Sequence, residues 1–148
     1  MARTDKLTSG NRIFNGTYVQ GWLDGDVLYE ATALSAKIAV NKQDVYLPRQ
    51  FMADTKVMSA KGTGSLTMSK VNSRMLLLMQ EMIQNGRDVR HTIVSLLDDP
   101  DAYGHERVAL YGVSFDDLTV TDWTNNSMLS FEAPFTFTSF ELLDAVEA

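Results

Sequence analysis

Four acidic side chains gather in a short segment that has the oxygen ligands a hard cation needs. They are Asp98, Asp99, Asp101 and Glu106, and Pro100 lies among them. A metal held by such carboxylates could activate water for hydrolysis. The segment lacks the regular ligand spacing and central glycine of a calcium loop, and aspartate beside proline is ordinary turn chemistry. We therefore predict a turn here, and a small metal-dependent β-barrel hydrolase stays open as an alternative.

The histidines and glycines give no stronger catalytic pattern. His91 lies in an expected strand and His105 in an expected turn, without the His-x-His or His-Glu-x-x-His spacing of zinc sites. Gly62-Thr63-Gly64 opens a strand, so it is expected to permit a bulge or a close backbone approach, not to cradle phosphate. The sequence contains no cysteine and no Gly-x-Ser-x-Gly motif. We predict no catalytic residue, no metal and no cofactor.

Charge and aromatic spacing argue against nucleic-acid binding. The formal net charge is −6 at pH 7, a sign that repels phosphate backbones. A stacking platform for bases would interleave its aromatics with basic residues, and residues 131–148 contain none. We assign the aromatic side chains of this segment to the core: Phe131, Phe135, Phe137 and Phe140.

The elements that must position these residues are mainly strands. The 148 residues, 45% of them hydrophobic, fit one domain spanning 1–148. A hairpin turn is expected at Asp24-Gly25. Alternation and turn residues predict these strands: Thr17–Leu23, Val27–Val40, Ser65–Lys70, Arg90–Leu97, Glu106–Tyr111, Val113–Trp123 and Leu129–Phe140.

One helix is expected, over Arg74–Asn85. Asn72 and Ser73 are good N-cap residues, and Gly86 suits the position after the last turn. Apolar residues recur at three- and four-residue spacing, which predicts a stripe that lies on a sheet: Met75, Leu76, Met79, Met82 and Ile83.

Two segments do not fit regular elements. Residues 1–16 are rich in turn formers and are expected to form an N-terminal arm anchored by Ile13 and Phe14. Residues 41–61 show no clear period, which predicts a long loop or arm. Their apolar content is high for a solvated loop, so we expect this segment to contact another subunit. The interface candidates are Val45, Tyr46, Leu47, Phe51, Met52, Val57 and Met58.

The faces of the strands that point away from the core carry small and hydroxyl side chains. Such a face is either a solvated surface rich in threonine, a good strand former, or a smooth lining. Parity assigns these residues to it: Ala33, Ser35, Lys37, Ala39, Ser65, Thr67, Ser69, Thr119, Thr121, Thr136 and Thr138.

Several motifs together resemble one protein family. Gly62-Thr63-Gly64-Ser65-Leu66 runs into Lys70–Arg74, residues 98–108 read Asp-Asp-Pro-Asp-Ala-Tyr-Gly-His-Glu-Arg-Val, and residues 134–137 read Pro-Phe-Thr-Phe before Phe140–Leu143. With Phe14–Thr17 and Leu23–Gly25, this pattern resembles the tail tube proteins of PBSX-type contractile tails, found in myovirus-like phages, defective prophages and tailocins. The match follows the whole chain in order, except at residues 41–61.

The resemblance implies a fold and a function. It implies a β-sandwich or barrel-like domain with one flanking helix, whose copies form hexameric rings with a continuous inner β-barrel. Stacked rings would make the tail tube of a virion or phage-like particle, a conduit for DNA ejection or envelope puncture. Implied partners are further copies of itself and the tail sheath, tape-measure and baseplate proteins, with assembly in the bacterial cytoplasm, no specific DNA binding and no membrane binding. A type VI-like secretion tube is the alternative.

The resemblance also suggests which residues would face the channel of such a tube. The lumen-facing candidates are Ala33, Ser35, Lys37, Ser65, Thr67, Ser69, Thr119 and Thr121.

Overall fold

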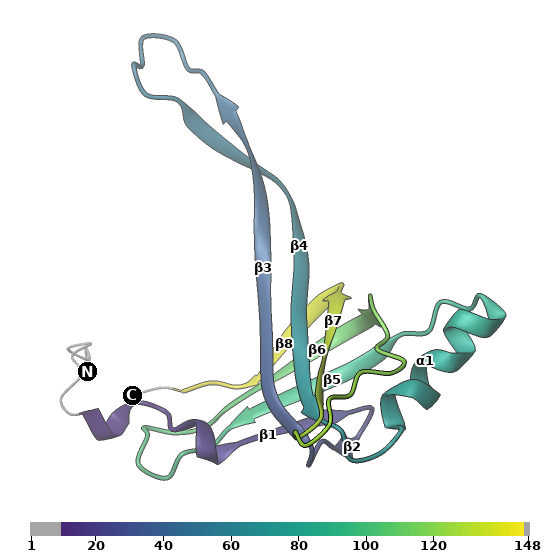
Figure 1. Cartoon of the computed structure of the whole chain (residues 1–148). Helices are drawn as coiled ribbons and strands as arrows, with labels where there is room; N and C mark the ends of the chain where they lie inside the picture. The colour runs from purple at the N-terminus through teal and green to yellow at the C-terminus, as the bar shows by residue number, and fades with distance from the viewer. Residues whose placement is uncertain (1–9, 147–148) are drawn as a thin grey trace.

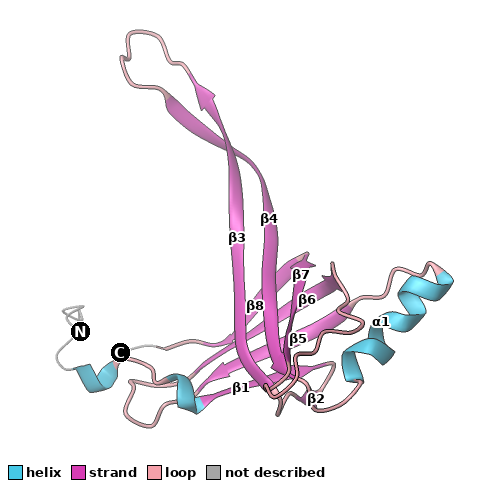
Figure 2. Cartoon of the chain, viewed as in Figure 1, coloured by secondary structure: helices cyan, strands magenta, loops and turns pink. Residues whose placement is uncertain are grey.

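The computed structural model describes residues 10–146, which form a compact body with one long hairpin projecting from it (Figure 1). Strands dominate this described part of the chain, and its single α-helix lies beside the body (Figure 2). Two short 3-10 helices, Gly10–Arg12 and Gly16–Tyr18, precede the elements β1 Val19–Leu23, β2 Asp26–Val27, β3 Ala31–Val45, β4 Asp54–Ser69, α1 Arg74–Asn85, β5 His91–Leu97, β6 Glu106–Phe115, β7 Ser130–Phe137 and β8 Ser139–Asp144. The mainly-β prediction with one helix is confirmed.

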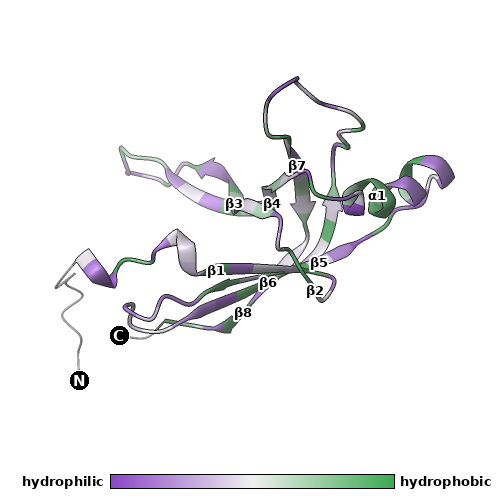
Figure 3. Cartoon of the chain, turned by 60° about the horizontal axis from the view of Figure 1, so that its bottom comes forward, coloured by the Kyte–Doolittle hydropathy of each residue, from purple (hydrophilic) through white to green (hydrophobic). Residues whose placement is uncertain are grey.

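The strands form one eight-stranded sheet that doubles back on itself. Its order is β2-β1-β5-β6-β7-β4-β3, and β8 pairs with the edge of β6 that lies opposite β5. Strand β6 belongs to both halves, because its first part pairs with β5 and β8 while Ser114 and Phe115 pair with β7. The halves lie as two layers (Figure 3), as a sandwich-like domain requires.

The hydrophobic core fills the space between these layers and α1. Its most deeply buried large side chains are Leu66, Met68, Ile93, Val113 and Phe135, which come from both halves of the sheet. Met75 and Met79 of α1 complete this cluster. Burial of apolar side chains from facing layers is the main stabilisation of such a domain.

The helix has the predicted bounds. Asn72 Oδ1 accepts a hydrogen bond from the Arg74 backbone N–H at 3.1 Å, and Gly86 adopts the left-handed conformation at φ 66°. Met75 and Met79 are buried as expected. Ile83 is exposed, so the apolar stripe is narrower than predicted. The Asp24-Gly25 turn is also confirmed, because both residues have positive φ between β1 and β2.

Several strand predictions are wrong in detail. The first strand begins at Val19 after a 3-10 turn, and the expected strand Val27–Val40 is interrupted after Val27 and resumes at Ala31. Of the strand predicted over Val113–Trp123, only the residues up to Phe115 belong to a strand, and residues 116–129 contain none. Rich β-branched content in 118–121 imitates a strand pattern, and no neighbouring strand pairs with this stretch among the described residues.

Residues 41–61 are mostly strand, not loop. β3 and β4 pair antiparallel from Ala31–Met68 out to Val45–Asp54. Only Gly62–Ser69 of β4 also pairs with β7. We call residues 39–61 the hairpin arm, the part of this ribbon that extends beyond β7 (Figure 1).

Candidate assembly surfaces

The hairpin arm exposes every predicted subunit-interface residue. Val45, Tyr46, Leu47, Phe51, Met52, Val57 and Met58 are all exposed, and the Phe51 side chain is fully so. Such a concentration of exposed apolar side chains is typical of a surface that contacts another molecule. Their role at an interface stays a prediction.

The core-facing side of the β3–β4 ribbon continues onto the arm without a core to cover it. Leu66, which is fully buried, lies opposite Leu34, and the same face continues through the pairs Ile38–Gly62 and Val40–Ala60. Ile38 and Val40 are 43% and 48% exposed. The apolar face is therefore longer than the domain that it packs against.

The opposite face of this ribbon carries the small and hydroxyl residues. Ala33 pairs with Thr67, Ser35 with Ser65 and Lys37 with Thr63, so these side chains share one side of the sheet. β7 extends this side through Glu132, Pro134 and Thr136. We call this the hydroxyl face. Its full set is Ala33, Ser35, Lys37, Ala39, Lys61, Thr63, Ser65, Thr67, Ser69, Ser130, Glu132, Pro134 and Thr136.

Two predicted members of that face lie elsewhere. Thr119 and Thr121 belong to residues 116–129, which follow β6 as irregular chain, and they line a cavity with Leu76 of α1. They share no sheet face with Ser65 and Thr67, because the strand expected there is absent. Thr138 also departs from the face: it sits in the bend between β7 and β8.

Two glycines keep the hydroxyl face and the aromatic core on opposite sides of a thin sheet. A Cβ on Gly64 would lie 2.3 Å from the Ser35 carbonyl oxygen and 2.6 Å from the Phe135 ring. A Cβ on Gly62 would lie 2.5 Å from the Phe137 ring. The predicted close backbone approach is confirmed: the phenylalanine rings lie directly against the β4 backbone.

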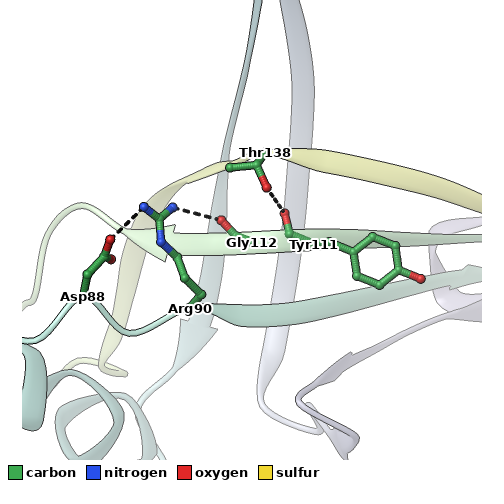
Figure 4. A network of polar contacts seen from close by, with 5 residues as sticks. All are labelled: Asp88, Arg90, Tyr111, Gly112 and Thr138. Atoms are coloured by element: carbon green, nitrogen blue, oxygen red, sulfur yellow. Dashed lines mark hydrogen bonds and ion pairs between the residues drawn. The ribbon is translucent and has the colours of Figure 1, made fainter.

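Strand β6 changes partners at Gly112, which has φ 65°. The Thr138 backbone N–H and hydroxyl both donate to the Tyr111 carbonyl oxygen, at 3.0 and 3.3 Å. Arg90 donates to the Gly112 carbonyl oxygen at 3.3 Å and pairs with Asp88 at 2.9 Å (Figure 4). These contacts satisfy carbonyl groups at the irregular point, so the corner between the two halves is held by specific hydrogen bonds.

Several strand edges have no partner within residues 10–146. β3 pairs only with β4, and the arm part of β4 pairs only with β3. β8 pairs only with β6, and its Phe140 and Leu142 are exposed. Unpaired edges offer backbone N–H and C=O groups to another chain. The sequence pattern did not reveal these edges, because pairing is set by the tertiary fold.

The acidic cluster serves the turn that we predicted. Asp99 is buried, and its two carboxylate oxygens accept hydrogen bonds from the Asn15 and Asp101 backbone N–H groups, each at 2.9 Å. No group of three or more potential metal ligands exists in residues 10–146. Asp99 therefore ties the N-terminal segment to the β5–β6 connection.

The N-terminal segment docks on that connection by other contacts than those expected. Arg12 donates to the Asp101 carbonyl oxygen at 3.0 Å, and its guanidinium lies 4.9 Å from the Tyr103 ring centroid. Ile13 is 60% exposed, so its predicted role as an anchor is wrong, whereas Phe14 is half-buried. Residues 1–9 of the predicted arm lie outside the described residues.

The histidines also make local contacts. His91 Nδ1 lies 2.7 Å from Asp24 Oδ2, and the His91 ring packs against Phe115 beneath α1. His105 Nε2 lies 3.4 Å from Oδ2 of Asp144, the last residue of β8. The two rings belong to separate contacts, each with one carboxylate, and this suits a structural role.

The fold defined by these layers is that of tubes in contractile systems. The structure resembles the tube-terminating cap of the anti-feeding prophage, with a TM-score of 0.74 at 12% identity over 98% of this chain and 100% of that one. It also resembles a chain of the sheath–tube complex of PVC, an extracellular contractile injection system. That TM-score is 0.69 at 9% identity over 96% and 95% of the two chains.

Sequence comparison gives the family. The model of the family described as "Phage tail tube protein" matches residues 6–144. The chain is 34% identical over 123 residues to the phage-like element PBSX protein XkdM of Bacillus subtilis (strain 168), covering 82% of this chain and 84% of that protein. The chain belongs to the phage tail tube protein family, with a structural role in a virion tail.

Proposed function

We propose that copies of this chain polymerise as stacked hexameric rings into the inner tube of a contractile tail. The carrying observation is the apolar face of the β3–β4 ribbon, which continues from the core-facing side onto the hairpin arm and is exposed at Ile38 and Val40. Burying this face against another copy would remove apolar surface from water. Unpaired edges on β3 and β8 would let neighbouring sheets join into a closed barrel.

In such a tube the hydroxyl face would line the channel as a passage for DNA or as the wall of a puncturing device. Its charged side chains are Lys37, Lys61 and Glu132, and the chain carries −6 overall. Lys37 and Lys61 lie in successive pairs on this face, so it carries a formal excess of one positive charge per copy. So small an excess neutralises few phosphates and therefore releases few counterions. Tail sheath, tape-measure and baseplate proteins are the partners this role requires. A role without catalysis fits Asp99, whose oxygens already accept backbone N–H groups.

Electron microscopy of shortened chains tests the assembly. Val40 lies opposite Ala60, so replacing residues 41–59 by Asn-Gly closes the ribbon with a two-residue hairpin turn and keeps the register. We expect tubes from the concentrated wild-type protein and only folded monomers from the shortened one. Circular dichroism and urea unfolding would check that the body is intact. Absence of tubes from the wild type, or normal tubes from the shortened protein, would contradict the proposal.

Channel electrostatics has its own test. We expect no measurable binding of duplex DNA to wild-type tubes even at low salt, where attraction is greatest. Glu132→Lys would leave three basic groups and no acid among the charged residues of this face, so we expect binding that appears at low salt and fades as salt is added. Glu81→Lys, an exposed change on α1, is the control. Salt-sensitive binding by wild-type tubes would indicate a protein that holds DNA.

A further inference from the structure

The end of the hairpin arm is an ordered apolar tip. We define the tip as residues 46–53. Its Tyr46, Phe51 and Met52 side chains are 81%, 105% and 79% exposed. A turn orders it, in which the Gln50 N–H donates to the Leu47 carbonyl oxygen at 3.3 Å. An ordered tip can present its side chains with a smaller loss of conformational entropy on binding.

Arg49 occupies a backbone position that favours glycine. Its φ is 63°, and it follows Pro48 at the third position of the turn, where a type II turn calls for Gly or Asn. An arginine held there is strained in a way that glycine would avoid, and strain of this kind clusters at functional positions. The arginine side chain at this position is therefore a candidate for a functional contact.

A cavity of about 300 Å³ lies at the opposite end of the ribbon, between the start of α1 and residues 116–129. Its lining includes Lys70, Leu76, Val120, Trp123, Leu129 and Phe131. Val120 and Trp123 are 70% and 67% exposed. Large apolar side chains around an open concavity are typical of a site that receives a side chain from outside.

The tip cannot fill this cavity in its own chain. Phe51 precedes β4 and Lys70 directly follows it, so the 16 residues of β4 separate the tip from the cavity. An extended strand of that length spans roughly 50 Å. A tip that fills such a cavity must come from a different copy.

Charge favours this match. The tip carries Arg49 and no acidic residue, whereas residues 116–129 carry Asp116, Asp117 and Asp122 and no lysine or arginine. Lys70 is the basic residue of the lining, and its Nζ is already in contact with an aromatic ring of its own chain, 5.9 Å from the Phe131 centroid. Opposite charges around an apolar contact fix the orientation in which two surfaces meet.

We propose that the tip of one copy docks in the cavity of a second copy, with Phe51 entering among Val120 and Trp123 and Arg49 facing Asp122. The inference rests on the proposed function and adds the receiving site for the arm. Each copy has one tip and one cavity, so the contact is head-to-tail and propagates along the assembly.

Engineered disulfides test the contact directly, because the chain has no cysteine of its own. The double variant Phe51→Cys/Val120→Cys would be assembled, oxidised and run on a non-reducing gel. We expect a ladder of multimers, since each chain links to two others when the paired Cα atoms lie within about 7 Å. The control Phe51→Cys/Ile83→Cys places the second thiol at an exposed α1 position outside the cavity. It should give dimers at most.

Charge reversal gives an independent reading. Arg49→Asp keeps a residue that tolerates the left-handed region and should abolish tubes by placing like charges together. Combining it with Asp122→Arg should restore them, while Arg87→Asp at an exposed position just after α1 should assemble normally. If wild-type protein makes no tubes, the proposed function itself fails. Wild-type tubes with neither a ladder nor rescue would overturn the docking alone, and would leave the cavity to another tail protein.

Discussion

The two halves of β4 place one continuous strand in two different surroundings. Residues 62–69 are all buried or half-buried, and they pair with β3 on one side and β7 on the other. Residues 54–61 are exposed throughout and pair with β3 alone. Residues 62–69 have the packing that holds a domain together. Residues 54–61 keep the strand conformation while their apolar side chains remain available for contact with another molecule.

This difference shows how a chain can be ready for assembly before assembly occurs. Backbone pairing specifies the shape of the arm, and little of its apolar surface is buried within one copy. Burial is the term that would stabilise the arm further, so it would have to come from a second molecule. The comparison predicts that the same kind of substitution has a large effect on folding stability in the body and a small one in the arm.

Paired phenylalanine truncations give the largest expected effect. Phe135→Ala removes a fully buried ring of the body and should lower the free energy of unfolding by about 3–5 kcal/mol. Phe51→Ala removes a fully exposed ring of the tip and should change it by less than about 0.5 kcal/mol. Urea unfolding of the monomer measures both. Equal losses would mean that the tip packs within its own chain.

A methyl group on Gly64 tests the close packing beneath the hydroxyl face. Gly64→Ala places a Cβ against the Ser35 carbonyl and the Phe135 ring, and overpacking of this kind should cost about 1–3 kcal/mol. Gly104→Ala, where nothing lies within 4 Å of the added Cβ, is the control. If the two variants have the same midpoint temperature in thermal unfolding, the sheet is less tightly packed at Gly64 than the structure shows.

Two arginines, Arg74 at the start of α1 and Arg87 just after its end, extend the comparison to ion pairs. Arg74 lies 3.2 Å from Glu30, whose side chain is 6% exposed, whereas the Arg87–Glu81 pair is solvated. Arg74→Met leaves a buried carboxylate without its partner and should cost about 1–3 kcal/mol. Arg87→Met should cost less than about 0.5 kcal/mol. The measurement is urea unfolding at neutral pH, and a reversed order would contradict the assignment.

The smallest expected effect concerns Tyr111 on β6. Its hydroxyl donates to Glu141 Oε2 at 2.7 Å, and this hydrogen bond to a carboxylate raises the pKa of Tyr111. Because the folded pKa is the higher one, the stabilisation is complete below the ordinary pKa of about 10 and is lost as pH rises through the raised value. Glu141→Gln should lower the pKa of Tyr111 in an ultraviolet titration, with Tyr111→Phe identifying its signal.

The body was largely predictable from the sequence. The helix bounds follow from Asn72, Gly86 and the apolar spacing between them, and all three signals are local. Parity placed Ser35 and Ser65 on one face because strand alternation survives wherever one side of a sheet is buried.

The arm and residues 116–129 were harder to predict. With no buried side, residues 54–61 show no alternation, so their sequence predicts a loop where the structure has a strand. Thr119 and Thr121 gave the converse error, since β-branched residues suggested a strand that no neighbour supports. The cavity beside Trp123 brings α1 and residues 116–129 together, and no local pattern could indicate it.

The continuity of β4 also has a mechanical consequence. A pull on the tip along the ribbon passes into β4 and from there to β3 and β7, its antiparallel neighbours. Hydrogen bonds in such ladders lie perpendicular to the strands, so an axial load shears many of them together instead of opening them one at a time. A tube joined through these arms would transmit thrust and tension through backbone ladders, with each body acting as an anchor.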